Sequence, residues 1–238
     1  MSDLDNLAER ISANLAGVRD RIGQAAERAG RHSDEVRLIA VTKGFALEVA
    51  IAAVQAGIED LGENRVQEAE RKITGWPAEL QRPTWHLIGN LQTNKAKRAC
   101  SLFDHIHSVS SVRLAKEISR RAEAMDRRAT CLLEVNVAGE ASKHGFSQRE
   151  IERAAPELAA LPMIDWLGLM TMAPLSEPES NRTYFRRLSQ LQGVLATSFA
   201  GHPWSRLSMG MTNDFEVAVE EGATDVRIGR AIFGERSS

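Results

Sequence analysis

Lys43 occupies a position from which a lysine can do covalent chemistry. It comes just after the apolar run of residues 36–41 (VRLIAV) and precedes Gly44. A short run rich in β-branched residues is typical of a strand buried on both faces, so the amine is expected at a strand end. Burial lowers the pKa of a lysine, and a neutral amine can form a Schiff base with an aldehyde. A lysine that simply extends to water is the more frequent case, so the position alone does not decide.

Two segments near the C-terminus predict phosphate-binding turns. Residues 208–214 (SMGMTND) pass from a predicted strand through Gly210 into a helix with Thr212 at its N-cap, and residues 227–234 (RIGRAIFG) repeat this pattern. Glycine lets backbone approach a ligand, and the N–H groups at a helix N-terminus suit a phosphate. Ordinary strand-to-helix turns are the alternative. Together with Lys43, the segments indicate a ligand with an aldehyde at one end and a phosphate at the other.

The elements that must position these residues alternate between strands and helices. Strands are predicted from eight apolar runs, at residues 36–41, 59–62, 84–89, 105–109, 130–137, 164–172, 206–211 and 225–229. Nearly every run ends in a polar or glycine-containing segment, as the functional face of a barrel requires. A doubly wound open sheet, the alternative, would gather such residues at one switch point. We therefore predict an α/β fold, a single (β/α)8 TIM-type barrel, with residues 1–238 as one domain.

Residues 1–30 predict a long amphipathic helix packed on this barrel. Apolar side chains recur at three- and four-residue steps, at Leu4, Leu7, Ile11, Leu15, Val18, Ile22 and Ala29. Ser2 with Asp5 resembles a capping box, and Gly30 suits the position that follows a helix.

Composition excludes several classes of protein. The formal net charge of −2 gives no field that attracts nucleic acid or an anionic membrane. Two cysteines provide neither a disulfide framework nor a metal-ligand spacing. No signal peptide and no apolar stretch of about 18 residues is present. We expect a soluble, cytoplasmic protein that is monomeric and holds no metal.

Other polar residues have more ordinary explanations. His86 lies within a predicted strand, where a core histidine is expected, and His105 and His107 share one strand face without a third metal ligand. The segment 136–146, which contains Lys143, is predicted to be a loop that either covers the ligand or only connects two elements. A helix begins within residues 62–72, and its polar side chains are expected in solvent, namely Gln67, Glu68, Glu70 and Arg71.

These motifs together resemble the pyridoxal phosphate homeostasis proteins, a family related to the barrel domain of alanine racemase. The resemblance runs in order along the chain through residues 40–45, 61–68, 85–95, 107–111, 134–146, 168–174, 207–214 and 226–234. It implies pyridoxal 5′-phosphate as the cofactor and Lys43 as its Schiff-base lysine. Arg65 departs from the family's pattern, where a tyrosine is common, and Arg230 stands in place of a small hydroxyl residue.

The resemblance also implies the remaining cofactor contacts. The phosphate cradle is formed by Ser208 and the backbone of Gly210, Met211 and Thr212 on one side, and by Gly229 and Arg230 on the other. Asn64 lines the pocket, and Arg227 faces the pyridine nitrogen. An arginine there keeps the nitrogen unprotonated, which makes the ring a poorer electron sink than an aspartate would.

The function implied is binding rather than turnover. A racemase needs a second base, which alanine racemase takes from a tyrosine of its C-terminal domain. The only tyrosine here, Tyr184, falls in a predicted helix, and Ser238 follows soon after the eighth predicted strand. We expect a protein that holds the reactive aldehyde, limits its free concentration and delivers it to apo-enzymes. A slow racemase or another fold-type III enzyme is the second hypothesis, and an aldolase-like barrel is the third.

Overall fold

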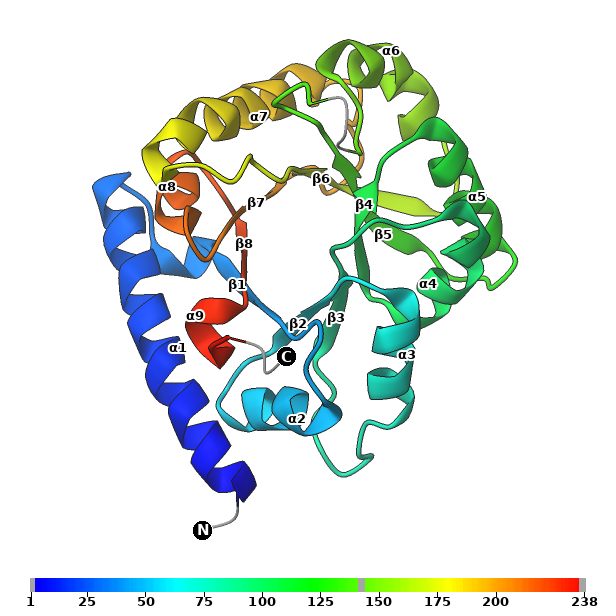
Figure 1. Ribbon diagram of the computed structural model, residues 1–238. Helices are drawn as coiled ribbons and strands as arrows, with labels where there is room; N and C mark the ends of the chain where they lie inside the picture. The colour runs from blue at the N-terminus through cyan, green and yellow to red at the C-terminus, as the bar shows by residue number, and fades with distance from the viewer. Residues whose placement is uncertain (1–2, 141–143, 236–238) are drawn as a thin grey trace.

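Eight parallel strands close into a barrel in the computed structural model, which describes residues 3–140 and 144–235 (Figure 1). The strands are β1 (Arg37–Val41), β2 (Asp60–Glu63), β3 (Thr84–Leu87), β4 (His105–Val109), β5 (Ala129–Glu134), β6 (Ile164–Met170), β7 (Arg206–Met211) and β8 (Asp225–Ile228). Each strand pairs with the next in sequence, and β8 returns to β1 with Arg37 opposite Asp225 and Ala40 opposite Ile228. The predicted barrel is therefore confirmed, and the open sheet is excluded.

Helices surround the strands in a ring (Figure 1). They are α1 (Asp3–Arg28), α2 (Leu47–Gln55), α3 (Val66–Thr74), α4 (Ala96–Leu102), α5 (Val112–Glu123), α6 (Gln148–Ala159), α7 (Arg182–Leu195), α8 (Phe215–Glu220) and α9 (Arg230–Phe233), with short 3-10 turns η1 (Ser33–Glu35), η2 (Thr93–Lys95) and η3 (Pro178–Asn181). The predicted N-cap of α8 is wrong by two residues: Asp214 occupies that position, and its Oδ1 accepts a bond from the Met211 N–H at 2.7 Å. None of the described helices is long and apolar enough to cross a membrane.

The N-terminal helix α1 lies along the outside of the barrel against α2, α8 and α9 (Figure 1). Its apolar stripe is buried there, including Ile11, Leu15, Val18 and Ile22. Gly30 follows the helix with a left-handed φ of 66°, as predicted. Ser2 lies outside the described residues, so the predicted capping box stays a prediction.

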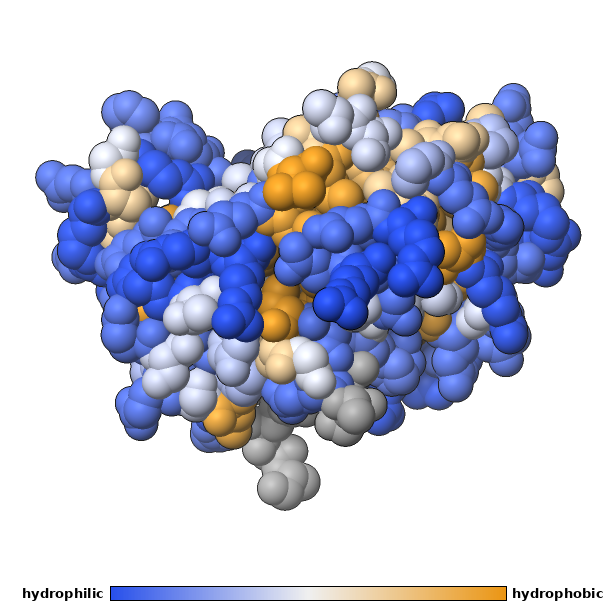
Figure 2. All heavy atoms as spheres, turned by 90° about the horizontal axis from the view of Figure 1, so that it is seen from above, coloured by the Kyte–Doolittle hydropathy of each residue, from blue (hydrophilic) through white to orange (hydrophobic). Residues whose placement is uncertain are grey.

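The side chains of the strands form two layers, one between the strands and the helices and one inside the barrel. Side chains alternate along each strand. Those that face the helices are apolar and fully buried, for example Ala40, Leu61 and Trp85. Several that face the barrel interior are polar: the ring of His107 on β4 reaches Ser208 on β7, a strand that does not adjoin β4. The face of the molecule seen in Figure 2 is mainly hydrophilic, with apolar side chains exposed between the hydrophilic ones.

Candidate cofactor site

A cavity of about 310 Å³ opens at the C-terminal ends of the strands. Segments that follow β1, β2, β6, β7 and β8 line it, so residues far apart in sequence meet at one mouth of the barrel. This volume is at the lower end of the range for small-molecule sites. The C-terminal mouth is also where barrel proteins place their functional residues.

Most of the predicted site residues meet in this cavity. Its lining includes Lys43, Asn64, Met211, Thr212, Arg227, Gly229 and Arg230. Ser208 and Gly210 are not part of the lining. The cofactor contacts assigned to these nine residues stay predictions.

Ser208 and Gly210 make contacts outside the lining of the cavity. The Ser208 side chain is fully buried, and its Oγ accepts a hydrogen bond from Arg227 Nη1 at 2.7 Å. Gly210 has a φ of 89°, and an added Cβ would lie 2.6 Å from the Cβ of Ala218 on α8. Glycine is therefore required for the close approach of β7 to α8, whatever it contributes to a ligand.

The peptide groups on both sides of Lys43 are held by helix α3. Lys72 Nζ donates to the carbonyl oxygen of Thr42 at 2.7 Å, and the Gly44 N–H donates to Glu68 Oε1. Glu68 also accepts from Lys72 at 3.1 Å. The expectation that Glu68 points into solvent is therefore wrong. These contacts fix the strand end from which the Lys43 side chain extends.

Lys72 also forms a buried ion pair beneath this strand end. Its Nζ lies 2.6 Å from Oε1 of Glu63, which is fully buried and also accepts from the Thr42 hydroxyl at 2.7 Å. Burial raises the pKa of Glu63 above its usual value. Sequence reasoning missed Lys72. The spacing of Glu68 and Lys72, four residues apart on one helix face, was the signal that could have found it.

Arg227 brings a buried positive charge to the edge of the cavity. Nη1 donates to Ser208 Oγ, and Nη2 donates to the Thr171 carbonyl oxygen at 2.8 Å. Burial lowers the pKa of Arg227 to about 10, so it remains cationic at neutral pH. A guanidinium carries five N–H donors, so donors beyond these two bonds are available at the cavity.

Asn64 and Arg230 are two further polar side chains of the lining. Asn64 Oδ1 is buried and has no hydrogen-bond partner among the described residues. Arg230 lies at the rim, half exposed, and Nη2 donates to Asn213 Oδ1 at 3.1 Å. A buried oxygen without a partner is costly in a folded protein, and it marks a place where a ligand donor is missing.

The predicted loop at 136–146 does not reach the cavity in its described part. Asn136 Nδ2 donates to the Glu140 carbonyl oxygen, and His144 Nε2 lies 3.3 Å from Asn90 Nδ2. Lys143 lies outside the described residues. Elsewhere in the described chain no group of three His, Cys, Asp or Glu residues is placed to hold a metal ion.

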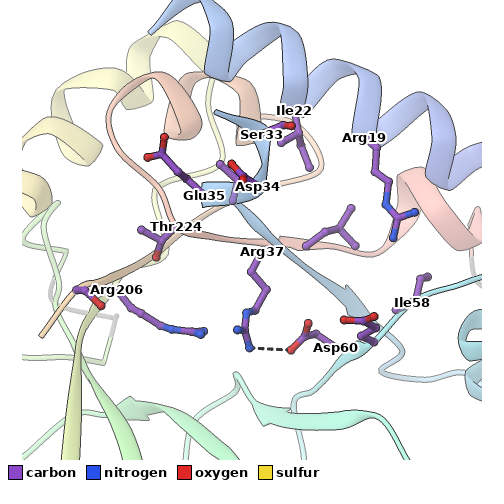
Figure 3. Close-up of a pocket in the computed structure, with 14 residues that line it drawn as sticks. Arg19, Ile22, Ser33, Asp34, Glu35, Arg37, Ile58, Asp60, Arg206 and Thr224 are labelled. Carbon is purple, nitrogen blue, oxygen red and sulfur yellow. Dashed lines mark hydrogen bonds and ion pairs between the residues drawn. The ribbon is translucent and has the colours of Figure 1, made fainter. Parts of the chain in front are cut away.

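A second cavity, of about 680 Å³, lies at the opposite mouth of the barrel (Figure 3). The N-terminal ends of β1, β2 and β7 line it, together with α1 and η1. Two of its arginines form ion pairs: Arg37 contacts Asp60 at 3.0 Å, and Arg206 contacts the buried Asp225 at 2.7 Å. The fold and the two cavities define a (β/α)8 barrel protein in which Lys43 and the buried Arg227 line the same small pocket.

Comparisons with known proteins agree with this class. Residues 13–237 match the family described as alanine racemase, N-terminal domain. The chain is 41% identical to the pyridoxal phosphate homeostasis protein of Aquifex aeolicus (strain VF5), over 97% of this chain and 99% of that protein. It is 37% identical to the protein of the same name from Escherichia coli (strain K12), over 95% and 97% of the two chains. The chain belongs to the pyridoxal phosphate homeostasis proteins, within the alanine racemase N-terminal domain family.

Solved structures show the same architecture. PipY of Synechococcus elongatus PCC7942, solved with pyridoxal phosphate bound, is 33% identical, has a TM-score of 0.83, and is matched over 94% of this chain and 100% of its own. Alanine racemase from Corynebacterium glutamicum has a TM-score of 0.67 at 20% identity, over 96% of this chain and 62% of that one. The second likeness shows the fold alone.

Proposed function

We propose that this protein binds pyridoxal 5′-phosphate at the C-terminal mouth of its barrel, through a Schiff base on Lys43, and serves the homeostasis of this cofactor. The observation that carries the proposal is that Lys43 and the buried cation of Arg227 line one cavity of about 310 Å³. Relatives named for pyridoxal phosphate homeostasis, and the PipY structure with the cofactor bound, support it.

The residues of the cavity fit this cofactor. When bound, pyridoxal 5′-phosphate supplies an aldehyde for a Schiff base and a ring that can withdraw electrons. Lys43 provides the amine, and Arg227 provides N–H donors to the ring nitrogen. Asn64 contributes a buried amide with an unused oxygen. Arg230 and the turn at Met211 and Thr212 provide the guanidinium and backbone groups for a phosphate.

The cavity favours holding the cofactor over turning over an amino acid. Among the described residues that line it, the titratable side chains are Lys43, Asp214, Arg227 and Arg230. Asp214 is buried and accepts from the Met211 N–H and from Asn181 Nδ2. Tyr184 lies on α7 and is not part of the lining. The described residues of the lining therefore offer no unengaged second base opposite Lys43, and an arginine at the ring nitrogen weakens the electron sink.

We infer further that the protein acts as a monomeric carrier in the cytoplasm and passes the cofactor to apo-enzymes. The open position of the cavity at the barrel mouth supports release to a partner. Mixing the loaded protein with an apo-enzyme that requires pyridoxal 5′-phosphate should restore activity faster than free cofactor at the same total concentration. Equal rates would contradict delivery while leaving binding intact.

A titration with pyridoxal 5′-phosphate, followed by the absorbance of the Schiff base, tests binding. The wild-type protein should give a saturable band, and Lys43→Ala should abolish it. Lys97→Ala, which removes an exposed lysine on α4, should leave the band unchanged. Loss of the band in both variants, or its survival in Lys43→Ala, would overturn the proposal. Alanine racemisation by the wild type should not exceed that of free cofactor.

A further inference from the structure

A continuous chain of hydrogen bonds crosses the barrel interior. It begins at the cavity of about 680 Å³ at the N-terminal ends of the strands (the lower cavity) and ends at the cavity of about 310 Å³ that contains Lys43 (the cofactor cavity). Its members, in order, are Asp60, His86, His107, Ser208 and Arg227. The four links measure 2.8 Å from Asp60 Oδ1 to His86 Nε2, 2.9 Å from His86 Nδ1 to His107 Nε2, 2.9 Å from His107 Nδ1 to Ser208 Oγ, and 2.7 Å from Ser208 Oγ to Arg227 Nη1. From the sequence we expect His86 to be a core histidine and His107 to share one strand face with His105, and Asp60 has no predicted role.

The two ends of this chain fix its direction. A guanidinium can only donate, so Ser208 Oγ must accept from Arg227 and has one proton left to give. At the other end, burial raises the pKa of Asp60, but the hydrogen bond from His86 and the nearby charges of Arg37 and Arg206 outweigh it and lower the pKa overall. Asp60 is therefore an ionised carboxylate at neutral pH and can only accept. His86 must carry its proton on Nε2.

Each hydrogen bond of the two imidazole rings can have one donor and one acceptor in this direction. His107 is fully buried, and burial lowers its pKa well below the ordinary value, so its ring is neutral. With the His86 proton on Nε2, Nδ1 of that ring accepts from Nε2–H of His107. His107 Nδ1 then accepts the proton of Ser208. Every donor meets an acceptor when both rings carry their proton on Nε2.

Reversal of any link would disturb the arginine. A His107 ring with its proton on Nδ1 would direct a second N–H at Ser208 Oγ, in competition with Nη1 of Arg227. The Thr171 carbonyl oxygen would then be the remaining described anchor of the guanidinium. We propose that Asp60, His86 and His107 are positioning residues, which hold the arginine at the head of the chain toward the cofactor. The effect on the cofactor rests on the proposed function, whereas the proton arrangement does not.

The far end of the chain lies at the lower cavity. Figure 3 shows Asp60 directed toward Arg37, with the side chain of Arg206 extending into the same space. Asp60 is partly accessible there, with 13% of its side chain exposed. The hydrogen bonds from Asp60 to Arg227 therefore connect the two mouths of the barrel.

His105 provides a matched control. It lies on β4 two residues before His107, on the same strand face, and its ring centroid is 4.8 Å from that of His86. Its Nδ1 has no hydrogen-bond partner among the described residues, so it packs against the chain without being a member. Burial lowers the pKa of His105 to about 3, and the nearby charges of Arg206 and Arg37 act in the same direction.

Nitrogen NMR of the histidine rings tests the proton arrangement in the protein without added cofactor. The spectra should show a proton on Nε2 and an unprotonated Nδ1 in both His86 and His107, as the hydrogen-bond geometry requires. In His86→Phe, the His107 proton should move to Nδ1, and exchange of the Arg227 guanidinium protons with water should quicken about tenfold. His105→Phe should leave both signals as in the wild type.

A cofactor titration on the same variants tests the consequence. His86→Phe should weaken pyridoxal 5′-phosphate binding about tenfold and shift the Schiff-base absorbance, whereas His105→Phe should stay within about twofold. Equal effects of the two variants, or a wild-type His107 with its proton on Nδ1, would overturn the proposal. The second outcome needs no variant to fold. A wild-type protein with the expected tautomers but no cofactor band would refute the proposed function and not the proton arrangement.

Discussion

The two mouths of this barrel hold similar kinds of side chain in opposite states. At the lower mouth, a cavity of about 680 Å³ is lined by Arg37, Asp60 and Arg206; Arg37 pairs with Asp60, and Arg206 pairs with the buried Asp225. At the upper mouth, a cavity of about 310 Å³ contains the cation of Arg227 and an unpartnered oxygen of Asn64.

This difference indicates how a functional site can be recognised in a barrel. Volume alone would select the lower mouth. The buried Asn64 Oδ1, which has no hydrogen-bond partner among the described residues, favours the upper one, because a buried group without a partner carries a cost that a ligand or water removes. The lower mouth follows the general rule that the N-terminal face of a barrel contributes stability.

Asp225→Asn should show the largest effect, on stability. Asp225 is fully buried and its carboxylate lies 2.7 Å from Arg206 and 3.8 Å from Arg37. Removing the negative charge leaves two arginines without it, at an expected cost of about 3–5 kcal/mol in the free energy of unfolding. Urea unfolding followed by tryptophan fluorescence measures this cost. The cofactor dissociation constant of the folded variant should change less than twofold.

Glu59→Gln is the control for this prediction. Glu59 lines the same lower cavity but is exposed. Its replacement should change the unfolding free energy by less than about 0.5 kcal/mol. Similar costs for the two variants would mean that the paired charges of the lower mouth do not stabilise the fold.

The burial of His105 predicts a pH dependence of stability. In the folded protein His105 stays neutral down to its pKa of about 3, whereas an unfolded histidine binds a proton near pH 6.5. Between these values the unfolded state binds more protons, so the free energy of unfolding falls as the pH falls. The slope is up to about 1.4 kcal/mol per pH unit for this residue. Urea unfolding at pH 7.5 and pH 5.0 should show a smaller loss in His105→Phe than in wild type, and an identical loss would refute the assignment.

Asn64→Ala should show the smallest effect, on binding alone. The buried Oδ1 has no hydrogen-bond partner in the part of the chain that the structure describes, so its removal should leave the unfolding free energy unchanged or slightly higher. Cofactor binding should weaken about tenfold, as measured by absorbance titration. Ser176→Ala is the control, because Ser176 lines the same cavity but donates its hydroxyl to Asn181 at 2.8 Å. If Asn64→Ala were destabilised but bound the cofactor normally, Asn64 Oδ1 would not be a contact of the cofactor.

The sequence alone predicted the arrangement of elements well. All eight strands lie within a few residues of their predicted ranges, and the ranges of β4 and β7 coincide with the prediction. The prediction succeeded because short apolar runs mark the strands and apolar residues at three- and four-residue steps mark the helices, and both patterns are visible along the chain. Polar strand ends then located the upper mouth, where Lys43, Asn64 and Arg227 meet.

Side-chain directions and partners across the barrel could not be predicted in the same way. The pairing of β7 with β8 shifts register between Ser208 and Met211, so alternation along the strand does not show which residue faces the cavity. The bond from His107 on β4 to Ser208 on β7 joins strands that are not neighbours. Lys72 and Glu68 appear in sequence as members of a polar helix, and only the packing of α3 under β1 turns them toward Lys43.

The central claim is that Lys43 holds the cofactor covalently at the upper mouth. The most direct measurement loads the protein with one equivalent of pyridoxal 5′-phosphate, reduces it with borohydride and maps the modified peptide by mass spectrometry. The phosphopyridoxyl group should be found on Lys43, and the modification should be lost in Lys43→Ala. An adduct spread over surface lysines, or an unmodified Lys43 in a protein that still binds the cofactor, would contradict the account.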